Sequence, residues 1–417
     1  MQSNSQRSLR VAVIGAGVVG CLVMYGLQQE PDVEVICIEK GPKDNVLAGT
    51  GLNVGPNAIK VLQQFNPELA ALLQSEEVSL PWLSWKAGLT DGTVIMDLPL
   101  LQVADNPGIR IRWSELYQHL RSQIKGRVLY DTQVVAMGYT SQNSGQLHLV
   151  IENKITGDRQ ELDGVDLIVG CDGRYSQVRE TFFGEPPKPN HLGVCVYRLL
   201  VPNSGDRIVD DYQQWFHNGC RLLTFAIPGD EVYIAGSFPI ELGAEVPESA
   251  KTPDFLRRCY EPPIGYSDVC QFLVDAICHR IDQIHWARIQ EMPTVFGDRS
   301  RHVICLGDSS HAMVPTLGQG ATQAFEDGCF FASQFRQALS KARYHRRRLD
   351  VPALVYQVES QRRQRIEFVK NFSWQASDSL LAGSNPKIEL QAKTQDPFLQ
   401  KLAKLYRDTP LISQNSF

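Results

Sequence analysis

The feature that most constrains this chain is a glycine-rich stretch close to its amino terminus. An apolar run at residues 11–14 leads into Gly15-Ala-Gly17-Val-Val-Gly20, and a second apolar run at residues 33–38 ends at Glu39. This order predicts a buried strand, a tight turn, a helix over residues 21–29 and a second buried strand. The unpaired N–H groups at the start of such a helix favour the binding of a pyrophosphate.

The glycines of this unit have separate mechanical roles. We expect Gly15 to make the tight turn, Gly17 to let backbone N–H groups approach a phosphate, and Gly20 to let the helix pack closely on the strand. Glu39 follows the last glycine by roughly 20 residues, where a carboxylate accepts hydrogen bonds from an adenosine ribose. The sequence therefore predicts a dinucleotide site made by Gly15, Ala16, Gly17, Val18, Val19, Gly20, Glu39 and Lys40.

Composition argues against several other classes of protein. The 417 residues carry a net charge of −5 with a pI of about 6.0, which is not the basic footprint of a nucleic-acid-binding protein. The ten cysteines and nine histidines show no metal-ligand spacing, so we expect no metal site and reduced, buried thiols in a cytoplasmic protein. No apolar run reaches about 18 residues, so we expect no membrane span. Residues 1–10 also lack the apolar centre of a signal peptide.

Two later strand-to-loop junctions carry aspartates. Residues 167–170 precede Cys171-Asp172-Gly173, and residues 302–306 precede Gly307-Asp308, which a predicted helix over 320–340 follows. A carboxylate after a buried strand needs hydroxyl partners, and the glycines of Gly318-Gln-Gly320 permit close backbone approach to a flat ring. The field of the helix N-terminus would stabilise negative charge on that ring. The alternative for the first junction is a plain turn with Asp172 or Ser176 as helix cap and Arg179 as a surface residue or an anchor.

Between these motifs the pattern changes. Residues 80–98 predict antiparallel strands around Asp91-Gly92, and residues 191–240 form a further β-rich block. Helices are expected over 58–73, 252–283 and 352–380, a loop over 42–48, and a largely extended tail over 381–417 with one short helix near 397–407. The nucleotide-binding elements are thus scattered along the chain, with a β-rich unit inserted between them.

The three motifs, in this order and spacing, resemble the fingerprints of single-component FAD-dependent aromatic hydroxylases of the para-hydroxybenzoate hydroxylase type. The turn Gly49-Thr-Gly51, with Pro56-Asn57 after it, resembles the salicylate and 6-hydroxynicotinate hydroxylase branch. The resemblance covers residues 10–375. It implies an α/β fold: a Rossmann-type, glutathione-reductase-like FAD-binding domain with an inserted β-sheet substrate domain and C-terminal helices.

The resemblance sets the domain boundaries that we expect. The FAD-binding domain would comprise residues 10–80, 108–185 and 286–345. The substrate domain would comprise a hairpin at 81–107 and a β-sheet at 186–285, and residues 346–417 would form a C-terminal helical region and tail.

The resemblance also implies a reaction. FAD, reduced by NAD(P)H as co-substrate, would react with O2, and a flavin C4a-hydroperoxide would hydroxylate a small aromatic or polyketide-like substrate. The alternative is a flavin reductase or oxidase, or a halogenase or epoxidase, on the same scaffold; a non-catalytic flavin-binding protein is the alternative outside enzymology. The segment Trp82-Leu-Ser-Trp85 lacks the W-x-W-x-I-P pattern of halogenases. Monomer and homodimer both remain open.

Site residues follow from the same resemblance. Arg112 is a better candidate for a cofactor contact than Arg110, although Trp113 stands where some branches carry that arginine and a solvent-facing strand pair is the ordinary alternative. We expect His311 to be structural. Further cofactor contacts are expected at Gly51, Arg112, Asp172, Gly173, Asp308, Pro315, Gly318, Gln319, Gly320 and Ala321.

Catalytic candidates lie on the inserted sheet and in the last loop. Arg198 could face a carboxylated substrate, and Tyr197, His217 and Pro315 complete the candidate set. For each residue of the sheet, a role in core packing or an exposed position on the strand is the alternative. The sequence does not identify the base that would activate a substrate hydroxyl.

Overall fold

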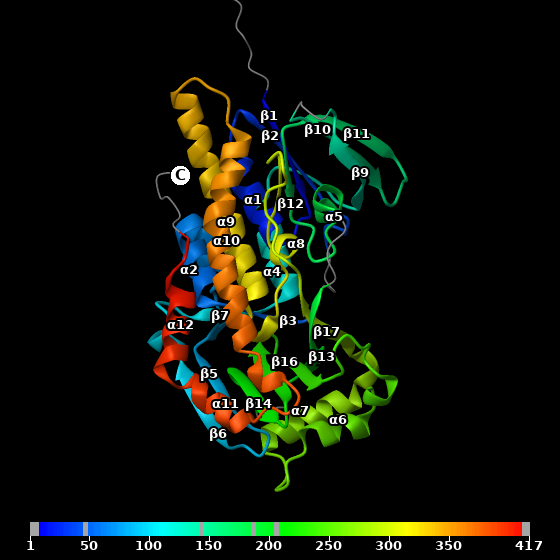
Figure 1. Cartoon of the computed structure of the whole chain (residues 1–417), viewed down its shortest axis with the longest axis vertical. Helices are drawn as coiled ribbons and strands as arrows, with labels where there is room; N and C mark the ends of the chain where they lie inside the picture. The colour runs from blue at the N-terminus through cyan, green and yellow to red at the C-terminus, as the bar shows by residue number, and fades with distance from the viewer. Residues whose placement is uncertain (1–7, 45–48, 142–144, 185–188, 204–207, 411–417) are drawn as a thin grey trace, which may run out of the picture.

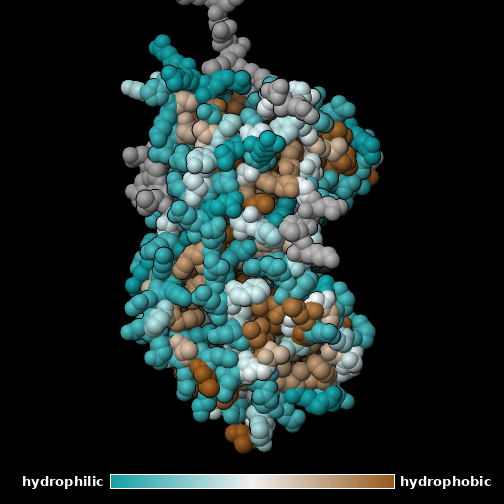
Figure 2. Space-filling model, in the orientation of Figure 1, coloured by the Kyte–Doolittle hydropathy of each residue, from teal (hydrophilic) through white to brown (hydrophobic). Residues whose placement is uncertain are grey.

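The computed structural model describes residues 8–44, 49–141, 145–184, 189–203 and 208–410. Most of the polar amino-terminal stretch and residues 45–48 of the expected loop lie outside these ranges. The molecule is elongated, with a parallel sheet near one end and a large mixed sheet near the other (Figure 1). The face shown in Figure 2 is mostly hydrophilic, with apolar patches in its lower half.

The parallel sheet contains the strands that precede all three motifs. Its order is β18-β12-β1-β2-β8, and every neighbouring pair is parallel. These strands are β1 (Leu9–Ile14), β2 (Val33–Ile38), β8 (Arg127–Leu129), β12 (Leu167–Gly170) and β18 (Val303–Cys305). Since parallel strands share one carboxyl edge, the loops after β1, β12 and β18 meet there, although about 300 residues separate the first from the last.

Both faces of this sheet are covered. Helices α1 (Val18–Leu27) and α9 (Gln319–Tyr344) pack so closely that a methyl group at Gly26 would lie 2.5 Å from Cβ of Ala332. A small antiparallel sheet packs its apolar side chains against Ala12, Ile14 and Ile168 of β1 and β12. It consists of β9 (Thr132–Tyr139), β10 (Leu147–Asn153) and β11 (Arg159–Val165). This arrangement confirms the predicted α/β, Rossmann-type fold.

The mixed sheet has the order β17-β13-β16-β15-β14-β5-β6. Helices α6 (Pro253–Tyr260) and α7 (Asp268–His279) cover one face, and the other face is turned toward the loops that follow the parallel strands. The strands are β5 (Ser84–Leu89), β6 (Val94–Pro99), β13 (Asn190–Pro202), β14 (Tyr212–His217), β15 (Cys220–Ile227), β16 (Glu231–Pro239) and β17 (His285–Glu291). The expected hairpin at Asp91-Gly92 is therefore the β5–β6 pair, which joins the sheet through the parallel pairing of β5 with β14.

Shorter elements connect the two large sheets. A sheet of order β3-β7-β4 lies between them, with β3 (Gly51–Val54), β4 (Leu80–Trp82) and β7 (Gly108–Arg112). The remaining helices are α2 (Pro56–Phe65), α3 (Pro67–Leu73), α4 (Trp113–Ser122), α5 (Gln177–Phe183), α8 (Asp308–His311), α10 (Val351–Gln375), α11 (Pro386–Lys393) and α12 (Asp396–Arg407). In the part of the chain that the structure describes, no helix is long and apolar enough to cross a membrane, and no cluster of three potential metal ligands occurs.

Three segments differ in detail from what the sequence predicted. The helix expected over 58–73 is divided because the Asn66 side chain accepts a hydrogen bond from Leu69 N–H and Pro67 begins a new helix. The helix expected over 252–283 is divided into α6 and α7 by a segment that contains Pro262 and Pro263. The tail, expected to be largely extended, contains α11 as well as the expected helix near 397–407, now α12.

Gly236 of β16 provides a test of the packing beneath the mixed sheet. A methyl group there would lie 2.0 Å from the Tyr197 ring, which is fully buried. We expect Gly236→Ala to lower the free energy of unfolding by about 1–3 kcal/mol, because the ring must move within a packed core. Urea unfolding measures this change.

The matched control is Gly138→Ala in β9, where the nearest atom is the tip of His148 at 3.3 Å. This control should change stability by less than about 0.5 kcal/mol. Equal effects of the two substitutions would contradict the packing described for Gly236.

Candidate active site

A first cavity lies at the carboxyl edge of the parallel sheet. Its volume is about 390 Å³, and its walls come from all three motif loops together with α4 and β9. Predicted cofactor residues in its lining are Gly15, Gly17, Val18, Val19, Glu39, Lys40, Asp172, Gly173, Asp308, Gly320 and Ala321. The structure therefore brings together residues that the sequence separates by about 300 positions.

The glycine turn has the geometry expected of it. Gly15 has a φ of +98° and donates its N–H to the Ile38 carbonyl oxygen at 2.8 Å. A methyl group at Gly20 would lie 1.9 Å from the Gly15 carbonyl oxygen, whereas one at Gly17 would meet nothing within 4 Å. Gly15 is therefore needed for the turn and Gly20 for close packing, whereas Gly17 leaves open space at the start of α1.

Glu39 lies at the end of β2 beside this turn. Its carboxylate accepts hydrogen bonds from Ala16 N–H at 2.6 Å and Gly41 N–H at 2.7 Å. Each carboxylate oxygen has a further lone pair, so Glu39 can still accept a hydroxyl hydrogen bond within the cavity. Ala16 is buried behind the turn and contributes to the site through its backbone.

Asp172 supports the start of α5 and also presents a free carboxylate oxygen. Its Oδ2 accepts a hydrogen bond from Val178 N–H at 3.1 Å, while its buried Oδ1 has no partner among the described residues. Burial raises the pKa of this carboxyl group. Ser176 caps α5 as well, and Arg179 is an anchor, because it donates to the Pro293 carbonyl oxygen at 2.6 Å.

Asp308 is the first residue of α8, shortly after β18, and its carboxylate lies beside the start of α9. Its side chain is surrounded by protein but accessible from the cavity, and this burial raises the pKa of its carboxyl group, while His311 and Arg174 act in the opposite direction. A methyl group at Gly320 would lie 3.7 Å from Asp308 Oδ1. The carboxylate and the N-terminus of α9 therefore face the same space.

A fully buried charge cluster fixes the position of this loop. Asp327 of α9 accepts hydrogen bonds from Gly307 N–H at 2.7 Å, from His311 Nε2 at 2.7 Å and from Arg362 Nε at 2.7 Å. Although burial alone would raise the Asp327 pKa, the charges of His311 and Arg362 lower it to about 2. His311 is therefore in the structural position that we expected.

The same cluster reaches the other loops. Glu326 accepts hydrogen bonds from Arg362 Nη1 at 2.8 Å and from Asn57 Nδ2 at 2.6 Å. Gln319 accepts a hydrogen bond from Asn57 at 3.2 Å, and its side chain is fully buried outside both cavities. Gln319 thus supports the loop from behind. Gly318 beside it has a φ of +64°.

A second cavity adjoins the first over the mixed sheet. Its volume is about 650 Å³, and it shares Trp113, Asp308, Gly320 and Ala321 with the first cavity. Its floor is the face of the sheet that carries Val196, Arg198, Arg221, Leu223, Phe225, Tyr233, Ala235 and Ala287. The opposite wall includes the predicted residues Gly51, Pro315 and Gly318.

Strand alternation separates the catalytic candidates. Arg198 lines the second cavity, but its neighbour Tyr197 points through the sheet into the core under α6 and α7, where its hydroxyl lies 2.7 Å from that of Tyr260. His217 also lies outside the cavity lining, beside Asn218 at the end of β14. Adjacent residues of one strand face opposite sides of the sheet, so Tyr197 cannot line the cavity that Arg198 lines. Neither Tyr197 nor His217 is in the cavity lining, and these positions argue against the catalytic roles predicted for them.

Arg112 does not line either cavity. It forms an ion pair with Glu231, while Trp113, the next residue, lines both cavities. Arg110 is buried and donates to the carbonyl oxygens of Pro81 and Ala226, so it is neither solvent-facing nor a cofactor contact. The structure thus places Trp113, and not Arg112, at the cofactor cavity.

Two arginines of the second cavity were not among the predicted site residues. Arg221 of β15 is 2% exposed, and Arg174 follows the Asp172-Gly173 turn and donates to the Gln290 carbonyl oxygen at 3.0 Å. The sequence signal that could have found Arg221 was alternation in β15, where it shares a face with Leu223 and Phe225.

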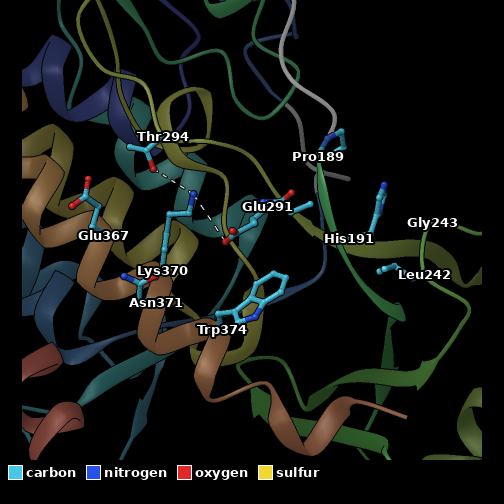
Figure 3. A pocket seen from close by; sticks show the side chains of 11 residues that line it. Pro189, His191, Leu242, Gly243, Glu291, Thr294, Glu367, Lys370, Asn371 and Trp374 are labelled. Carbon is cyan, nitrogen blue, oxygen red and sulfur yellow. Dashed lines mark hydrogen bonds and ion pairs between the residues drawn. The ribbon is translucent and has the colours of Figure 1, made fainter.

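A third hollow, of about 700 Å³, lies between α10 and the ends of β13 and β17. Figure 3 shows Lys370 directed toward Thr294 and Glu291, with Trp374 on the same helix and His191 opposite. Lys370 donates to the Met292 carbonyl oxygen at 2.6 Å, so the lysine of this hollow is already engaged. None of the predicted site residues lines it.

Comparisons with known proteins show which enzymes this chain resembles. No family model matches the chain. The chain is 27% identical over 335 residues to a 6-hydroxynicotinate 3-monooxygenase of Pseudomonas fluorescens. This match covers 78% of the chain and 82% of the relative. The chain is 23% identical over 359 residues to a salicylate hydroxylase of Pseudomonas putida, covering 79% of this chain and 77% of that protein.

The chain is a homologue of FAD-dependent aromatic monooxygenases.

The fold comparison agrees with the sequence comparison. Klebsiella pneumoniae HpxO, solved in complex with FAD and uric acid, superposes with a TM-score of 0.76 over 96% of this chain and 97% of that protein, at 18% identity. The resemblance to FAD-dependent aromatic hydroxylases and the predicted enzyme class, a monooxygenase among oxidoreductases, are confirmed. The relatives favour the monooxygenase over the alternative of a reductase, oxidase, halogenase or epoxidase.

FAD fits the residues of the monooxygenase's first cavity. The open space at Gly17 can admit a phosphate beside the N-terminus of α1, and Glu39 retains accepting capacity for ribose hydroxyls. Asp172 Oδ1 is an unpartnered buried oxygen, and Asp308 faces the junction of the two cavities. These donors and acceptors are of the kind that an adenine dinucleotide requires.

Gly17 and Gly20 provide a matched test of the cofactor site. Gly17→Ala should leave the stability of the FAD-free protein unchanged within about 0.5 kcal/mol, because a methyl group there meets no protein atom. It should weaken FAD binding at least about tenfold, a loss of about 1.4 kcal/mol, since the methyl group occupies phosphate space.

Gly20→Ala should instead destabilise the protein itself by about 1–3 kcal/mol, because the methyl group meets backbone. Chemical unfolding of FAD-free protein and fluorescence titration with FAD separate the two effects. Unchanged FAD affinity in Gly17→Ala would argue against phosphate binding at this turn.

Asp327→Asn tests the buried cluster. The substitution removes one of the two carboxylates that pair with Arg362, along with the charged partner of His311, so we expect a loss of about 3–5 kcal/mol in stability at neutral pH. Because the folded-state pKa of Asp327 is depressed to about 2, its contribution is present above the unfolded pKa of about 4 and is lost as the pH falls toward 2.

The wild-type protein should therefore lose more stability between pH 4 and pH 2 than the Asp327→Asn variant does. Urea unfolding across this range measures the difference. Asp163→Asn, on the exposed side of β11, is the control and should follow the wild type. An identical pH profile for Asp327→Asn would contradict the assigned role.

Proposed function

We propose that this monooxygenase uses FAD, NAD(P)H and O2 to hydroxylate a small aromatic substrate that carries an acidic group. The observation that supports the proposal most strongly is the junction of the two cavities at Asp308, Gly320 and Ala321. A dinucleotide in the first cavity would present its ring to the second cavity at this junction, above the apolar floor of the mixed sheet.

The residues of the first cavity would hold FAD in order along its length. The amides at the start of α1 would bind the pyrophosphate, and Glu39 with Lys40 would face the adenosine ribose. Asp308 would accept hydrogen bonds from the ribityl hydroxyls, and Gly318, Gly320 and Ala321 would approach the ring. When bound, FAD supplies two-electron transfer from a nicotinamide donor and activation of O2.

The protein contributes orientation and electrostatics at the junction. Helix α9 begins at Gln319, and its N-terminus would stabilise negative charge on the nearby edge of the flavin ring by about 1 kcal/mol or more. Trp113 and Pro315 close two sides of the space, and this enclosure would limit the access of water. Pro315 is therefore proposed as a shaping residue of the substrate cavity.

We propose an acidic group on the substrate because Arg198 lines the second cavity. Its side chain faces the second cavity, beside Tyr233, whose pKa is raised by burial while the Arg198 charge acts to lower it. A guanidinium group binds a carboxylate through two parallel hydrogen bonds, which would fix the orientation of an aromatic acid.

NAD(P)H is proposed to approach at the Asp172-Gly173 turn. This turn lines the first cavity, and Tyr175 beside it is 88% exposed, so its ring is accessible for stacking on a nicotinamide or adenine ring. The structure contains no second glycine-turn unit in the described residues that would provide a separate nucleotide domain. A cytoplasmic location is proposed because all ten cysteines are free.

We propose the domain division that the sequence predicted, with one boundary moved. β17 begins at the expected boundary at residue 285 but pairs with β13 of the mixed sheet. We therefore propose that the substrate domain extends through residue 291.

The function can be tested before the substrate is identified. FAD-loaded protein would be supplied with NADH or NADPH, ¹⁸O-labelled dioxygen and a panel of hydroxylated aromatic acids. We expect one ¹⁸O atom in the product and one reduced nicotinamide consumed for each product molecule. Quantitative release of hydrogen peroxide with every compound would favour an oxidase or reductase and would contradict the proposal.

Asp308→Ala tests the ribityl role in the same experiment. We expect it to lose FAD binding by at least about 100-fold, since charged hydrogen bonds of about 1.5–3 kcal/mol are removed, while the FAD-free protein unfolds as the wild type does. Asp163→Ala, an exposed carboxylate on β11, is the control and should retain FAD. An Asp308→Ala protein with wild-type FAD affinity would exclude this role.

A further inference from the structure

Arg221 is a buried cation without a protein counter-ion among the described residues. Its side chain is 2% exposed, and its Nε and Nη1 atoms have no hydrogen-bond partner in that part of the chain. Burial lowers the pKa of its guanidinium group, and the groups that act in the opposite direction are the tyrosines Tyr212, Tyr233 and Tyr260. A buried, unpaired charge is costly, so this position requires an anion from outside the chain.

The second cavity carries more cations than one substrate carboxylate would neutralise. Arg174, Arg198 and Arg221 all line it, and the Arg198 charge lowers the pKa of both Arg174 and Arg221, after the larger effect of burial. Asp308 is the carboxylate in the described lining. Arg288 also lines the cavity, but it is neutralised by Glu245 at 2.9 Å.

The two sheet arginines define separate positions on the cavity floor. Arg198 of β13 pairs with Ala235 of β16, which pairs with Leu223 of β15, and Arg221 lies two residues before Leu223. The two arginines are therefore two strands apart and offset by two residues, about 10 Å across the sheet and about 7 Å along it. Ala235 and Leu223 lie on the same face, and they leave an apolar floor for a ring between the two cations.

We propose that the substrate is an aromatic dianion, with one anionic group bound by Arg221 and the second bound by Arg198. Arg174 adds positive charge at the end of the cavity near Asp308. This inference rests on the proposed function, because it names the substrate class of the same site. The second anionic group is a carboxylate or a ring hydroxyl that ionises on binding, since either would pair with Arg198.

Calorimetric titration of FAD-loaded protein tests the dianion directly. The ligands are benzoate, benzene-1,3-dicarboxylate and 3-hydroxybenzoate, which share one ring and differ in charge. We expect the dicarboxylate to bind at least about tenfold more tightly than benzoate, and this preference to decrease at high salt. Equal affinities of the two acids would overturn the proposal.

The hydroxybenzoate titration distinguishes the two sources of the second charge. Binding as tight as that of the dicarboxylate, with proton release in buffers of different ionisation enthalpy, would assign an ionised hydroxyl. Binding only as tight as that of benzoate, without proton release, would assign a second carboxylate. Both results support a dianion as long as the dicarboxylate preference is present.

Variants assign the charges to residues. Arg221→Gln and Arg198→Gln should each reduce the dicarboxylate preference to threefold or less, and Arg221→Lys should restore part of it. The control is Arg257→Gln on α6, which removes an arginine of the same domain that is paired with Asp275; it should keep the full preference. FAD content and thermal unfolding show whether each variant is folded. A folded Arg221→Gln protein with unchanged preference would overturn the assignment.

Failure of the dianion inference can be distinguished from failure of the proposed function. If the labelled-oxygen experiment yields hydroxylated product and the two acids bind equally, the dianion inference alone fails. If the dicarboxylate preference is present but no labelled product forms with any acid, the oxygenation fails and the charge assignment stands.

Discussion

The active site depends on the hydrogen bonds that the buried carboxylate of Asp327 accepts. This carboxylate holds the N–H of Gly307, the imidazole of His311 and the guanidinium of Arg362 at once, within a region that water does not reach. Gly307 precedes the aspartate that faces both cavities, so the orientation of that aspartate is set from behind by α9 and α10. A buried charge of this kind is tolerated only when every partner is present, which makes the loop position nearly invariant once the protein has folded.

The mixed sheet complements this rigid frame with a patterned surface. Its strands alternate between a packed core under α6 and α7 and a floor that faces the cofactor loops. The same alternation decides which side chains can take part in chemistry, because a shift of one residue moves a side chain to the opposite face. Arg198 and Arg221 both occupy the cavity face, although they come from different strands, and this coincidence makes the cavity strongly cationic.

Local sequence signals predicted the backbone geometry of the glycine turn well. Gly15, Gly17 and Gly20 lie in the conformations expected of them, because the spacing of a strand, a turn and a helix is encoded within about 30 residues. Side-chain contacts across the fold were less predictable. Arg112 pairs with Glu231, and Tyr197 meets Tyr260, through partners more than 60 residues away that no local pattern reveals. Alternation in β15 could have placed Arg221 on the cavity face, but the absence of a hydrogen-bond partner for its Nε and Nη1 atoms among the described residues is visible only in the folded protein.

The parallel sheet has a consequence for how the protein is made. Its outer strand β18 and the arginine that secures Asp327 are synthesised long after β1 and β12. The ribosome therefore releases most of the chain before the cofactor pocket can close. Until then β12 has an unpaired edge, and contacts over such long sequence separations form slowly. Cofactor supply would thus matter once β18 and Arg362 have been synthesised, when FAD can trap the assembled pocket and shorten the time for which this edge is available to other chains.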